Sequence, residues 1–176
     1  MTLGRSLGWI HPNVLTIIGI IPQVLFFFFL QNHHYLPALL ALLATPLDLL
    51  DGLVARVNNK VTAFGGFLDS TLDRVADFLL LAGLYVGGLI SLPLTAFLVI
   101  TTFLISYTRS RGELASHARL AFNVGLIERP ERIGLIFLII AAQLVWPAII
   151  SSLAWLWLIL SLYTVLQRVW FAYRNL

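Results

Sequence analysis

The chain has 176 residues, of which 60% are hydrophobic and only 11% are charged, and its formal net charge is +3. Soluble globular domains carry about 25% charged residues, so this composition excludes an ordinary soluble domain and indicates an integral membrane protein. The mean hydropathy of +0.94 agrees with that class. No basic block of the kind that binds nucleic acid is present, so we expect no nucleic-acid partner. Cysteine is absent, which excludes disulfides and thiolate metal sites.

The N-terminal residues mix apolar and polar side chains before the first long apolar run. Residues 2–10 suit a short interfacial helix that lies on the membrane surface. His11, Pro12 and Asn13 are expected to end that helix and to start the first membrane span. No small-residue cleavage site follows, so we expect mature sequence and not a removed signal peptide.

Six apolar segments are each long enough to cross a hydrocarbon core of about 30 Å. Their predicted limits are 13–31, 35–56, 66–88, 92–112, 129–148 and 150–172. Pro22 is expected to kink the first span, and Gly83, Gly87 and Gly88 to let helices approach closely. With no internal repeat and no break in composition, the sequence predicts an all-α membrane protein with a single domain over residues 1–176.

The basic residues predict the orientation in the membrane. All eleven lie at the two chain ends, at the turn between spans two and three, or at the connection between spans four and five. The opposite connections carry none, so the positive-inside rule places both termini in the cytoplasm. The acidic residues collect on the same side. We therefore expect a multi-pass protein of the cell membrane whose chemistry faces the cytoplasm.

Four aspartates lie in or beside the second and third predicted spans. Helical periodicity places Asp48 and Asp51 on one face, and Asp69 and Asp73 likewise on one face. Each charge costs about 3 kcal/mol at the centre of a membrane helix, which disfavours a purely structural role. Four carboxylates repel one another unless divalent cations or protons lie between them. With no histidine or cysteine nearby, the sequence predicts the hard cations Mg²⁺ or Mn²⁺.

Two alternatives accompany this hypothesis. Asp77, one turn deeper than Asp73, is equally well explained by an ion pair with Arg74. A carboxylate-lined cation transporter is a second function class. A transporter is expected to spread its acids through the membrane depth, whereas these acids cluster at one end of the spans.

The spacing of these residues resembles the signature of the CDP-alcohol phosphotransferase family. The match runs from Asp48-x-x-Asp51-Gly52-x-x-Ala55-Arg56 to Gly65-x-x-x-Asp69-x-x-x-Asp73 and holds at every fixed position. The resemblance implies that the four aspartates hold two divalent cations that bridge the diphosphate of a CDP-linked lipid, with Asp73 as the general base. A two-metal mechanism agrees with that chemistry, because such ions stabilise both the attacking and the departing oxygen.

The same resemblance implies roles for the smaller residues of the signature. Gly52, Ala55 and Gly65 leave room for the cytidine nucleotide, and Arg56 meets a phosphate or an acid. The run Pro12-Asn13-x-x-Thr16 resembles the start of the family's first span, which lies near the nucleotide. A homodimer is expected from the resemblance alone.

Four arginines gather at the mouth of the fourth and fifth spans, and positive-inside anchoring explains one or two of them. They are Arg109, Arg111, Arg129 and Arg132. The pattern RSRGE…GLIERPER resembles the phosphatidylinositol-phosphate and archaetidylinositol-phosphate synthases, in which the matching positions bind the acceptor's phosphate. Arginine suits this task through bidentate contacts. Arg109 departs from the pattern, because lysine is usual there.

The sequence thus predicts transfer of a phosphatidyl-type group, diacylglycerol phosphate or archaeol phosphate, to a phosphorylated polyol with release of CMP. Inositol 1-phosphate is the favoured acceptor, and glycerol 3-phosphate is the main alternative. Whether the donor lipid carries ester-linked or ether-linked chains is left open. Arg168 and Arg174 either reach the acceptor pocket from the last helix or serve as interfacial anchors.

Overall fold

The structure is a computed structural model, and every regular element among the residues that it describes is a helix. The described residues are 12–45, 57, 61–117 and 120–176. The predicted all-α class is therefore confirmed for this part of the chain. The expected interfacial helix over residues 2–10 lies outside it, as does the stretch 46–56 that ends the second predicted span.

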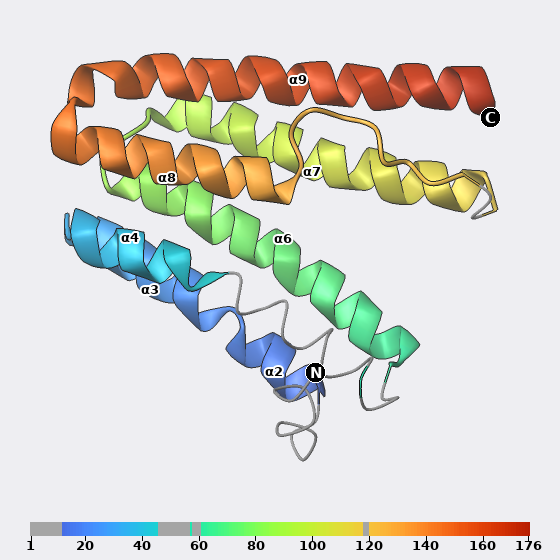
Figure 1. Cartoon of the computed structure of the whole chain (residues 1–176), viewed down its shortest axis with the longest axis horizontal. Coiled ribbons are helices and arrows are strands. Elements are labelled where there is room, and N and C mark those ends of the chain that lie inside the picture. Colours follow the sequence, from blue (N-terminus) through green and yellow to red (C-terminus); the bar gives the residue numbers. More distant parts are fainter. Residues whose placement is uncertain (1–11, 46–56, 58–60, 118–119) are drawn as a thin grey trace. The chain divides into compact units, whose positions relative to one another are not determined.

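The chain divides into two compact units, Met1–Gly87 and Gly88–Leu176. The helices of the first unit, blue to green in Figure 1, are α2 (Pro12–Ile18), α3 (Ile21–Gln31), α4 (Tyr35–Leu43) and α6 (Ala63–Val86). Helix α3 packs against both α4 and α6, and α2 packs against α6. Helix α6, which carries Asp69 and Asp73, therefore packs against both α2 and α3.

The first predicted span is broken into α2 and α3 at Gly19 and Ile20. Pro22 lies in the first turn of α3, where backbone N–H groups have no intrahelical acceptor, so the missing N–H of proline costs no hydrogen bond. The backbone N–H groups of Gln23 and Val24 both donate to Ile20 O at 3.1 Å. When the buried Gln23 amide is oriented with its nitrogen toward these carbonyl groups, it donates to Gly19 O at 2.9 Å and to Ile20 O at 3.0 Å. The predicted proline kink is confirmed, and a buried side chain satisfies the carbonyl groups that the break releases.

Helices α3 and α6 approach each other closely at two glycines. A Cβ added to Gly83 would lie 3.0 Å from the ring of Phe26, and one added to Gly87 would lie 3.2 Å from Leu30 Cβ. Phe26 and Leu30 are fully buried, so these glycines provide the space that the two side chains fill. Gly88 was expected to act in the same way, which is wrong. A Cβ there would meet nothing within 4 Å, and its φ of +73° serves the turn after α6.

Helix α6 starts three residues before its predicted limit of 66. Thr62 has an extended backbone, and its hydroxyl accepts a hydrogen bond from Gly65 N at 3.0 Å. This contact makes Thr62 the N-cap and satisfies one of the amide groups that the first turn leaves unpaired. The prediction followed hydrophobicity alone and so missed the cap, which begins the helix at Ala63.

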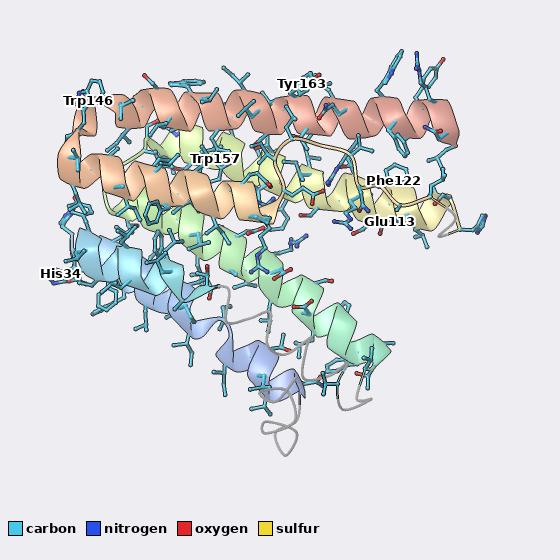
Figure 2. All side chains as sticks on the ribbon, viewed as in Figure 1. His34, Glu113, Phe122, Trp146, Trp157 and Tyr163 are labelled. Carbon is cyan, nitrogen blue, oxygen red and sulfur yellow. The ribbon has the colours of Figure 1, made fainter. Side chains whose placement is uncertain are left out.

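The second unit consists of α7 (Leu92–Ala115), α8 (Arg129–Val145), the 3₁₀ turn η2 (Pro147–Ile149) and α9 (Ile150–Asn175). Helix α9 packs against both α7 and α8, and the three run side by side in Figure 1. Figure 2 shows Trp157 inside this unit and Trp146 at the turn between α8 and α9. The long connection between α7 and α8 passes back alongside these helices.

Three helix ends of the second unit differ from the prediction by three residues, and one of them is the end of α9, which continues past 172 to Asn175. Helix α7 continues past Gly112 to Ala115, so this glycine does not end the helix. The buried ring of Phe122 instead fills the space beside Gly112. Helix α8 ends at Val145 and not at 148, because Pro147 has no N–H to continue the hydrogen-bond ladder. The chain passes through η2 into α9 instead.

Within the described part of the chain, three helical segments are long and apolar enough to cross a membrane. They are Asn13–Gln31, Leu92–Ala115 and Pro147–Asn175. Helix α6 is as long as α7 but carries four charged residues: Asp69, Asp73, Arg74 and Asp77. Large apolar side chains such as Phe97 and Ile159 stay exposed, which suits a lipid-facing surface. The chain is a membrane protein, and the arrangement in six spans stays a prediction.

Candidate active site

Part of the predicted nucleotide site lies where the first turn of α6 meets α2. A Cβ added to Gly65 would lie 3.3 Å from Asn13 Oδ1, so the side chain of Asn13 rests over the glycine. Thr16 follows one turn after Asn13 and is buried. Asp69 and Asp73 come four and eight residues after Gly65 and therefore continue the same face of α6. The structure brings Asn13 and Gly65 together and aligns both aspartates with them.

The carboxylates of α6 differ in their exposure to solvent. Asp69 is exposed, the Asp73 side chain is 20% exposed, and Asp77 is buried. Asp73 Oδ2 lies 3.5 Å from Arg74 Nη2, so Arg74 forms an ion pair with its neighbour in the chain. Asp69 and Asp73 are therefore the carboxylates of this helix that a ligand reaches from outside.

The remaining donor-site predictions lie outside the described residues. These are Asp48, Asp51, Gly52, Ala55 and Arg56. Their roles stay predictions. Among the residues that are described, no group of three or more His, Cys, Asp or Glu side chains forms a metal site. Only two of the four predicted metal-ligating aspartates belong to that part.

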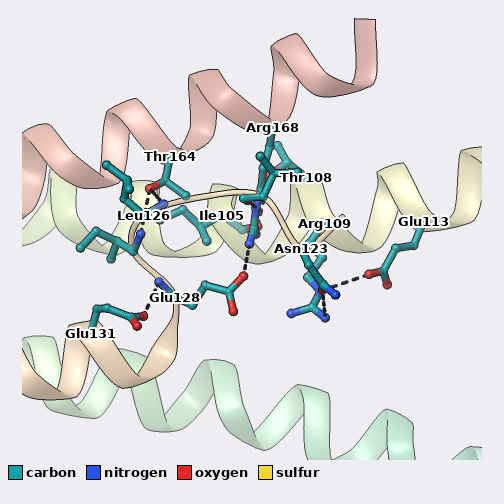
Figure 3. Close-up of polar contacts among 12 residues, drawn as sticks. Ile105, Thr108, Arg109, Glu113, Asn123, Leu126, Glu128, Glu131, Thr164 and Arg168 are labelled. Atoms are coloured by element: carbon teal, nitrogen blue, oxygen red, sulfur yellow. Dashed lines mark hydrogen bonds and ion pairs between the residues drawn. The ribbon is translucent and has the colours of Figure 1, made fainter. Parts of the chain in front are cut away.

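Arg109 is held on the surface of α7 by two polar contacts (Figure 3). Its Nε donates to Glu113 Oε1 at 3.1 Å, and its Nη2 donates to Asn123 Oδ1 at 3.0 Å. Asn123 belongs to the connection between α7 and α8, and nothing in the sequence pattern predicted a role for it. The Arg109 side chain is still 43% exposed. It is therefore oriented in advance and remains open to a ligand.

Arg129 and Arg132 lie one turn apart at the start of α8, the first half-buried and the second buried. A capping box fixes this end of the helix. The Glu128 side chain accepts from the backbone of the first turn, and Glu131 Oε2 accepts from Glu128 N at 2.9 Å. The cap fixes the backbone of this first turn and thereby the positions from which the side chains of Arg129 and Arg132 extend.

Arg111 is exposed and lies two residues after Arg109 on α7. Two residues correspond to about 200° around a helix, so the two arginines leave α7 on different faces. The structure does not bring Arg111 to the side of Arg109, and its predicted role is untested.

Arg168 of α9, for which the sequence allowed either a place in the acceptor pocket or a role as an interfacial anchor, is buried. Its side chain is 2% exposed; Nε donates to Val124 O at 2.7 Å, Nη1 donates to Ile105 O, and Nη2 pairs with Glu128 Oε1 at 2.9 Å (Figure 3). A buried charge requires such partners. The sequence feature that indicates this role is the position of Arg168, which follows Thr164 by four residues and so lies on the same, buried face of α9.

Arginines of three helices act on one region of the second unit. Arg109 of α7 and Arg132 of α8 lie close enough to Arg168 to repel its positive charge. The carboxylates of Glu128 and Glu113 attract that charge. Three guanidinium groups from three helices therefore lie in one region. Such a group of arginines suits an anionic ligand such as a phosphate, which guanidinium groups bind in a bidentate manner.

Comparison with known proteins identifies the family. The family model for CDP-alcohol phosphatidyltransferase matches residues 9–170. The archaetidylinositol phosphate synthase of Pyrococcus horikoshii is 41% identical over 175 residues, which cover 97% of this chain and 87% of that protein. The phosphatidylinositol phosphate synthase of Mycobacteroides abscessus is 34% identical over 90% of this chain and 75% of its own length.

Solved structures agree with the family match. The phosphatidylinositol phosphate synthase of Mycobacterium tuberculosis with CDP-DAG bound has a TM-score of 0.85 and 27% identity, and the match covers 98% of this chain and 92% of that one. A structure of the same enzyme with manganese and citrate gives the same TM-score over 88% of its length. These matches favour the enzyme over the transporter alternative. The chain belongs to the CDP-alcohol phosphatidyltransferase family and is a CDP-alcohol phosphotransferase.

Proposed function

We propose that this enzyme transfers a phosphatidyl-type group, diacylglycerol phosphate or archaeol phosphate, from a CDP-linked lipid to inositol 1-phosphate and releases CMP. The observation that carries this proposal is that Arg109, Arg132 and Arg168, from three helices, lie close enough for their charges to interact. A phosphate on the acceptor forms bidentate contacts with guanidinium groups, and an unphosphorylated polyol does not. The relatives support the choice of inositol, because their names specify archaetidylinositol or phosphatidylinositol phosphate.

The acceptor phosphate is assigned to the arginines at the ends of α7 and α8. They are Arg109, Arg111, Arg129 and Arg132. The contacts of Arg109 with Glu113 and Asn123 support this role, because they orient its guanidinium group while leaving it accessible. An oriented arginine loses less conformational entropy when it binds its ligand.

The donor's diphosphate is assigned to two divalent cations, Mg²⁺ or Mn²⁺, held by Asp48, Asp51, Asp69 and Asp73. The two aspartates that the structure describes fit this role, because both present accessible carboxylate oxygens on one face of α6. The manganese-containing structure of the related enzyme supports it. When bound, the cations neutralise the diphosphate and stabilise the attacking and leaving oxygens.

The cytidine nucleotide is assigned to the start of α2, the start of α6 and the signature residues between them. These residues are Asn13, Thr16, Gly52, Ala55, Arg56 and Gly65. The approach of Asn13 Oδ1 to Gly65 supports the assignment, because a side chain on residue 65 would fill the space next to that amide.

The reaction is a direct displacement at the phosphorus that bears the lipid alcohol. Asp73 accepts the proton of the acceptor hydroxyl as the general base. The hydroxyl oxygen bonds to the phosphorus, and the bond from that phosphorus to the CMP oxygen breaks. The arginines hold the acceptor's phosphate so that its hydroxyl is positioned for attack, which lowers the entropic part of the barrier.

The proposed membrane arrangement is a single domain over residues 1–176 with six spans and both termini in the cytoplasm. The distribution of basic residues supports this orientation. An active site at the cytoplasmic face lets the donor keep its lipid chains in the bilayer while the polar acceptor enters from water. The family resemblance adds a homodimer to the proposal.

An acceptor competition assay tests this function. Purified enzyme in detergent is given a labelled CDP-lipid, with ester-linked or ether-linked chains, and Mg²⁺. Inositol 1-phosphate, glycerol 3-phosphate and unphosphorylated inositol are then compared as acceptors by the release of CMP. We expect the highest kcat/KM with inositol 1-phosphate and little turnover with inositol. Preference for glycerol 3-phosphate would support the alternative acceptor, and turnover with inositol alone would refute the phosphate-binding role.

The role of Arg109 is tested by the variant Arg109→Gln. If this arginine binds the acceptor's phosphate, its loss raises the acceptor KM about tenfold or more and leaves the KM for the CDP-lipid unchanged. Arg174→Gln is the matched control, because Arg174 lies over the ring of Trp170 at the end of α9. An unchanged acceptor KM in Arg109→Gln would remove this residue from the acceptor site.

A further inference from the structure

We propose that the hydroxyl of Thr164 on α9 is a positioning element of the acceptor site. It fixes the segment that runs from Asn123, the hydrogen-bond partner of Arg109, to Glu128 at the start of α8. This segment, residues 123–128, is called the acceptor loop below. The proposal rests on the proposed function in one respect, namely that the arginines at the two ends of the acceptor loop bind the acceptor.

Thr164 forms three hydrogen bonds through one buried oxygen. Its side chain is 0% exposed. The Oγ1 atom accepts from Leu126 N at 3.2 Å and from Ile127 N at 3.1 Å, and it donates to Leu160 O at 2.9 Å (Figure 3). The hydroxyl oxygen thus accepts from two backbone amides of the acceptor loop, while the hydroxyl proton is donated to a carbonyl group of α9 itself.

The methyl group of Thr164 also fits the acceptor loop sterically. Gly125 has a φ of +139°, which residues other than glycine rarely adopt. A Cβ added there would lie only 2.5 Å from Thr164 Cγ2. Glycine at 125 and threonine at 164 are therefore matched in shape as well as in hydrogen bonding.

The acceptor loop meets the acceptor arginines at both of its ends. At one end Asn123 Oδ1 accepts from Arg109 Nη2. At the other end Glu128 caps α8, whose first turn carries Arg129 and Arg132. Thr164 bonds to the loop between these two ends. A shift of Leu126 and Ile127 would therefore move the partners of arginines on two helices at once.

Arg168 reinforces the same attachment one turn along α9. It donates to Val124 O and pairs with Glu128, the residues that flank the amides bound by Thr164. Two consecutive turns of α9 thus hold the acceptor loop through four of its six residues. The loop is not free to adapt to the ligand, and its conformation is set before the acceptor arrives.

The kinetic test compares Thr164→Val with Thr164→Ser. Valine keeps the shape and removes the oxygen, whereas serine keeps the oxygen and removes the methyl group. We expect Thr164→Val to raise the acceptor KM at least fivefold with the KM for the CDP-lipid unchanged. Thr164→Ser is expected to restore the acceptor KM to within about twofold of the unsubstituted enzyme. A purely structural role would instead lower the amount of active enzyme and leave both KM values unchanged.

Hydrogen exchange gives a readout that does not depend on turnover. Peptides that contain the amides of Leu126 and Ile127 are followed by mass spectrometry in the three forms of the protein. We expect exchange at these amides to be at least tenfold faster in Thr164→Val and nearly unchanged in Thr164→Ser. Equal protection in all three forms would overturn the proposal, even if Thr164→Val yields too little active enzyme for kinetics.

A double substitution tests the steric part. Gly125→Ala is expected to raise the acceptor KM because the new Cβ displaces the acceptor loop from Thr164. The effect should be smaller when it is introduced together with Thr164→Ser, since Cγ2 is then absent. Equal effects in both backgrounds would refute the steric contact.

Failure of the proposed function and failure of this proposal give different results. If the enzyme without substitutions prefers another phosphorylated acceptor, the proposed function fails, and the Thr164 comparison is made with that acceptor. If the preferred acceptor is inositol 1-phosphate and Thr164→Val has its normal KM, the proposed function stands and the role of Thr164 is refuted.

Discussion

Single residues of α6 determine which carboxylates are available for chemistry. Exposure decreases from Asp69 through Asp73 to Asp77, although all three repeat at four-residue intervals on one helix. Helical periodicity alone predicts the same exposure for all three carboxylates. The packing of α6 against its neighbours makes their exposure differ. Asp73 is the last carboxylate of the series that a substrate reaches, which agrees with its assignment as the general base.

Asp73→Asn tests this assignment directly. The amide has the same shape as the carboxylate but cannot accept the hydroxyl proton, so kcat is expected to fall about 10²- to 10⁴-fold. The measurement is the release of CMP under saturating substrates. Thr71→Val is the control on the same helix, because the Thr71 hydroxyl is exposed and only donates to Phe67 O. Retained turnover in Asp73→Asn would exclude Asp73 as the base.

Gly112 shows how one missing side chain allows a loop to pack. A Cβ at this position would lie 2.3 Å from the ring of Phe122, which is fully buried and meets Phe171 edge-on with ring centroids 5.1 Å apart. The ring is therefore confined on two sides, and it cannot move away from a new methyl group without losing other contacts.

Gly112→Ala is expected to destabilise the protein. Overpacking costs about 1–3 kcal/mol, which exceeds the gain of up to about 1 kcal/mol that alanine brings to a helix. The control is Gly134→Ala in α8, where a Cβ meets nothing within 4 Å and only the gain remains. Thermal unfolding in detergent should show a lower midpoint for the first variant and an equal or higher one for the second. A higher midpoint for Gly112→Ala would contradict the packing described here.

At the scale of elements, α9 combines two roles. Its buried face packs against α7 and α8, and its later turns hold the acceptor loop through Thr164 and Arg168. The loop buries polar backbone groups without forming regular structure of its own. Side chains of α9 supply the partners that a helix or a sheet would otherwise provide.

The two arginines of α9 should differ strongly in their contribution to stability. Arg168→Met keeps the volume of the side chain but leaves two backbone carbonyl groups and Glu128 without their donor, for which we expect a loss of about 3–5 kcal/mol. Arg174→Met removes an exposed contact with Trp170, worth about 0.5–1 kcal/mol. Chemical unfolding in detergent measures both, and equal losses would refute the special role of Arg168.

At the scale of the whole molecule, orientation in the membrane is the property that the charge distribution predicts most directly. The chain has no cysteine, so single cysteines can be introduced without removing others. His34 lies between α3 and α4, and Ala121 lies between α7 and α8; both are exposed. The predicted topology places these two connections on opposite sides of the membrane.

Labelling of intact cells with an impermeant maleimide tests the topology. We expect His34→Cys to react in intact cells and Ala121→Cys to react only after the membrane is permeabilised. The cysteine-free protein controls for background labelling. The opposite pattern would invert the predicted orientation, and labelling of both positions in intact cells would exclude the arrangement in six spans.

The sequence by itself determined the membrane class, the stripe of Gly65, Asp69 and Asp73, and the break near Pro22. Each of these depends on local rules: hydrophobic length, the helical repeat and the fixed φ of proline. The spacing of the aspartates was also sufficient to indicate the family, because a signature on one or two helices needs no knowledge of distant contacts.

Only the tertiary structure decided how the acceptor loop is held. Thr164 meets Ile127 across 37 residues of sequence, and Arg168 meets Ile105 across 63. No periodic pattern connects such positions, and a threonine or an arginine within a span has several possible partners. Its partner is selected by which backbone groups the packing of α7, α8 and α9 leaves buried and unsatisfied, and that is a property of the folded unit as a whole.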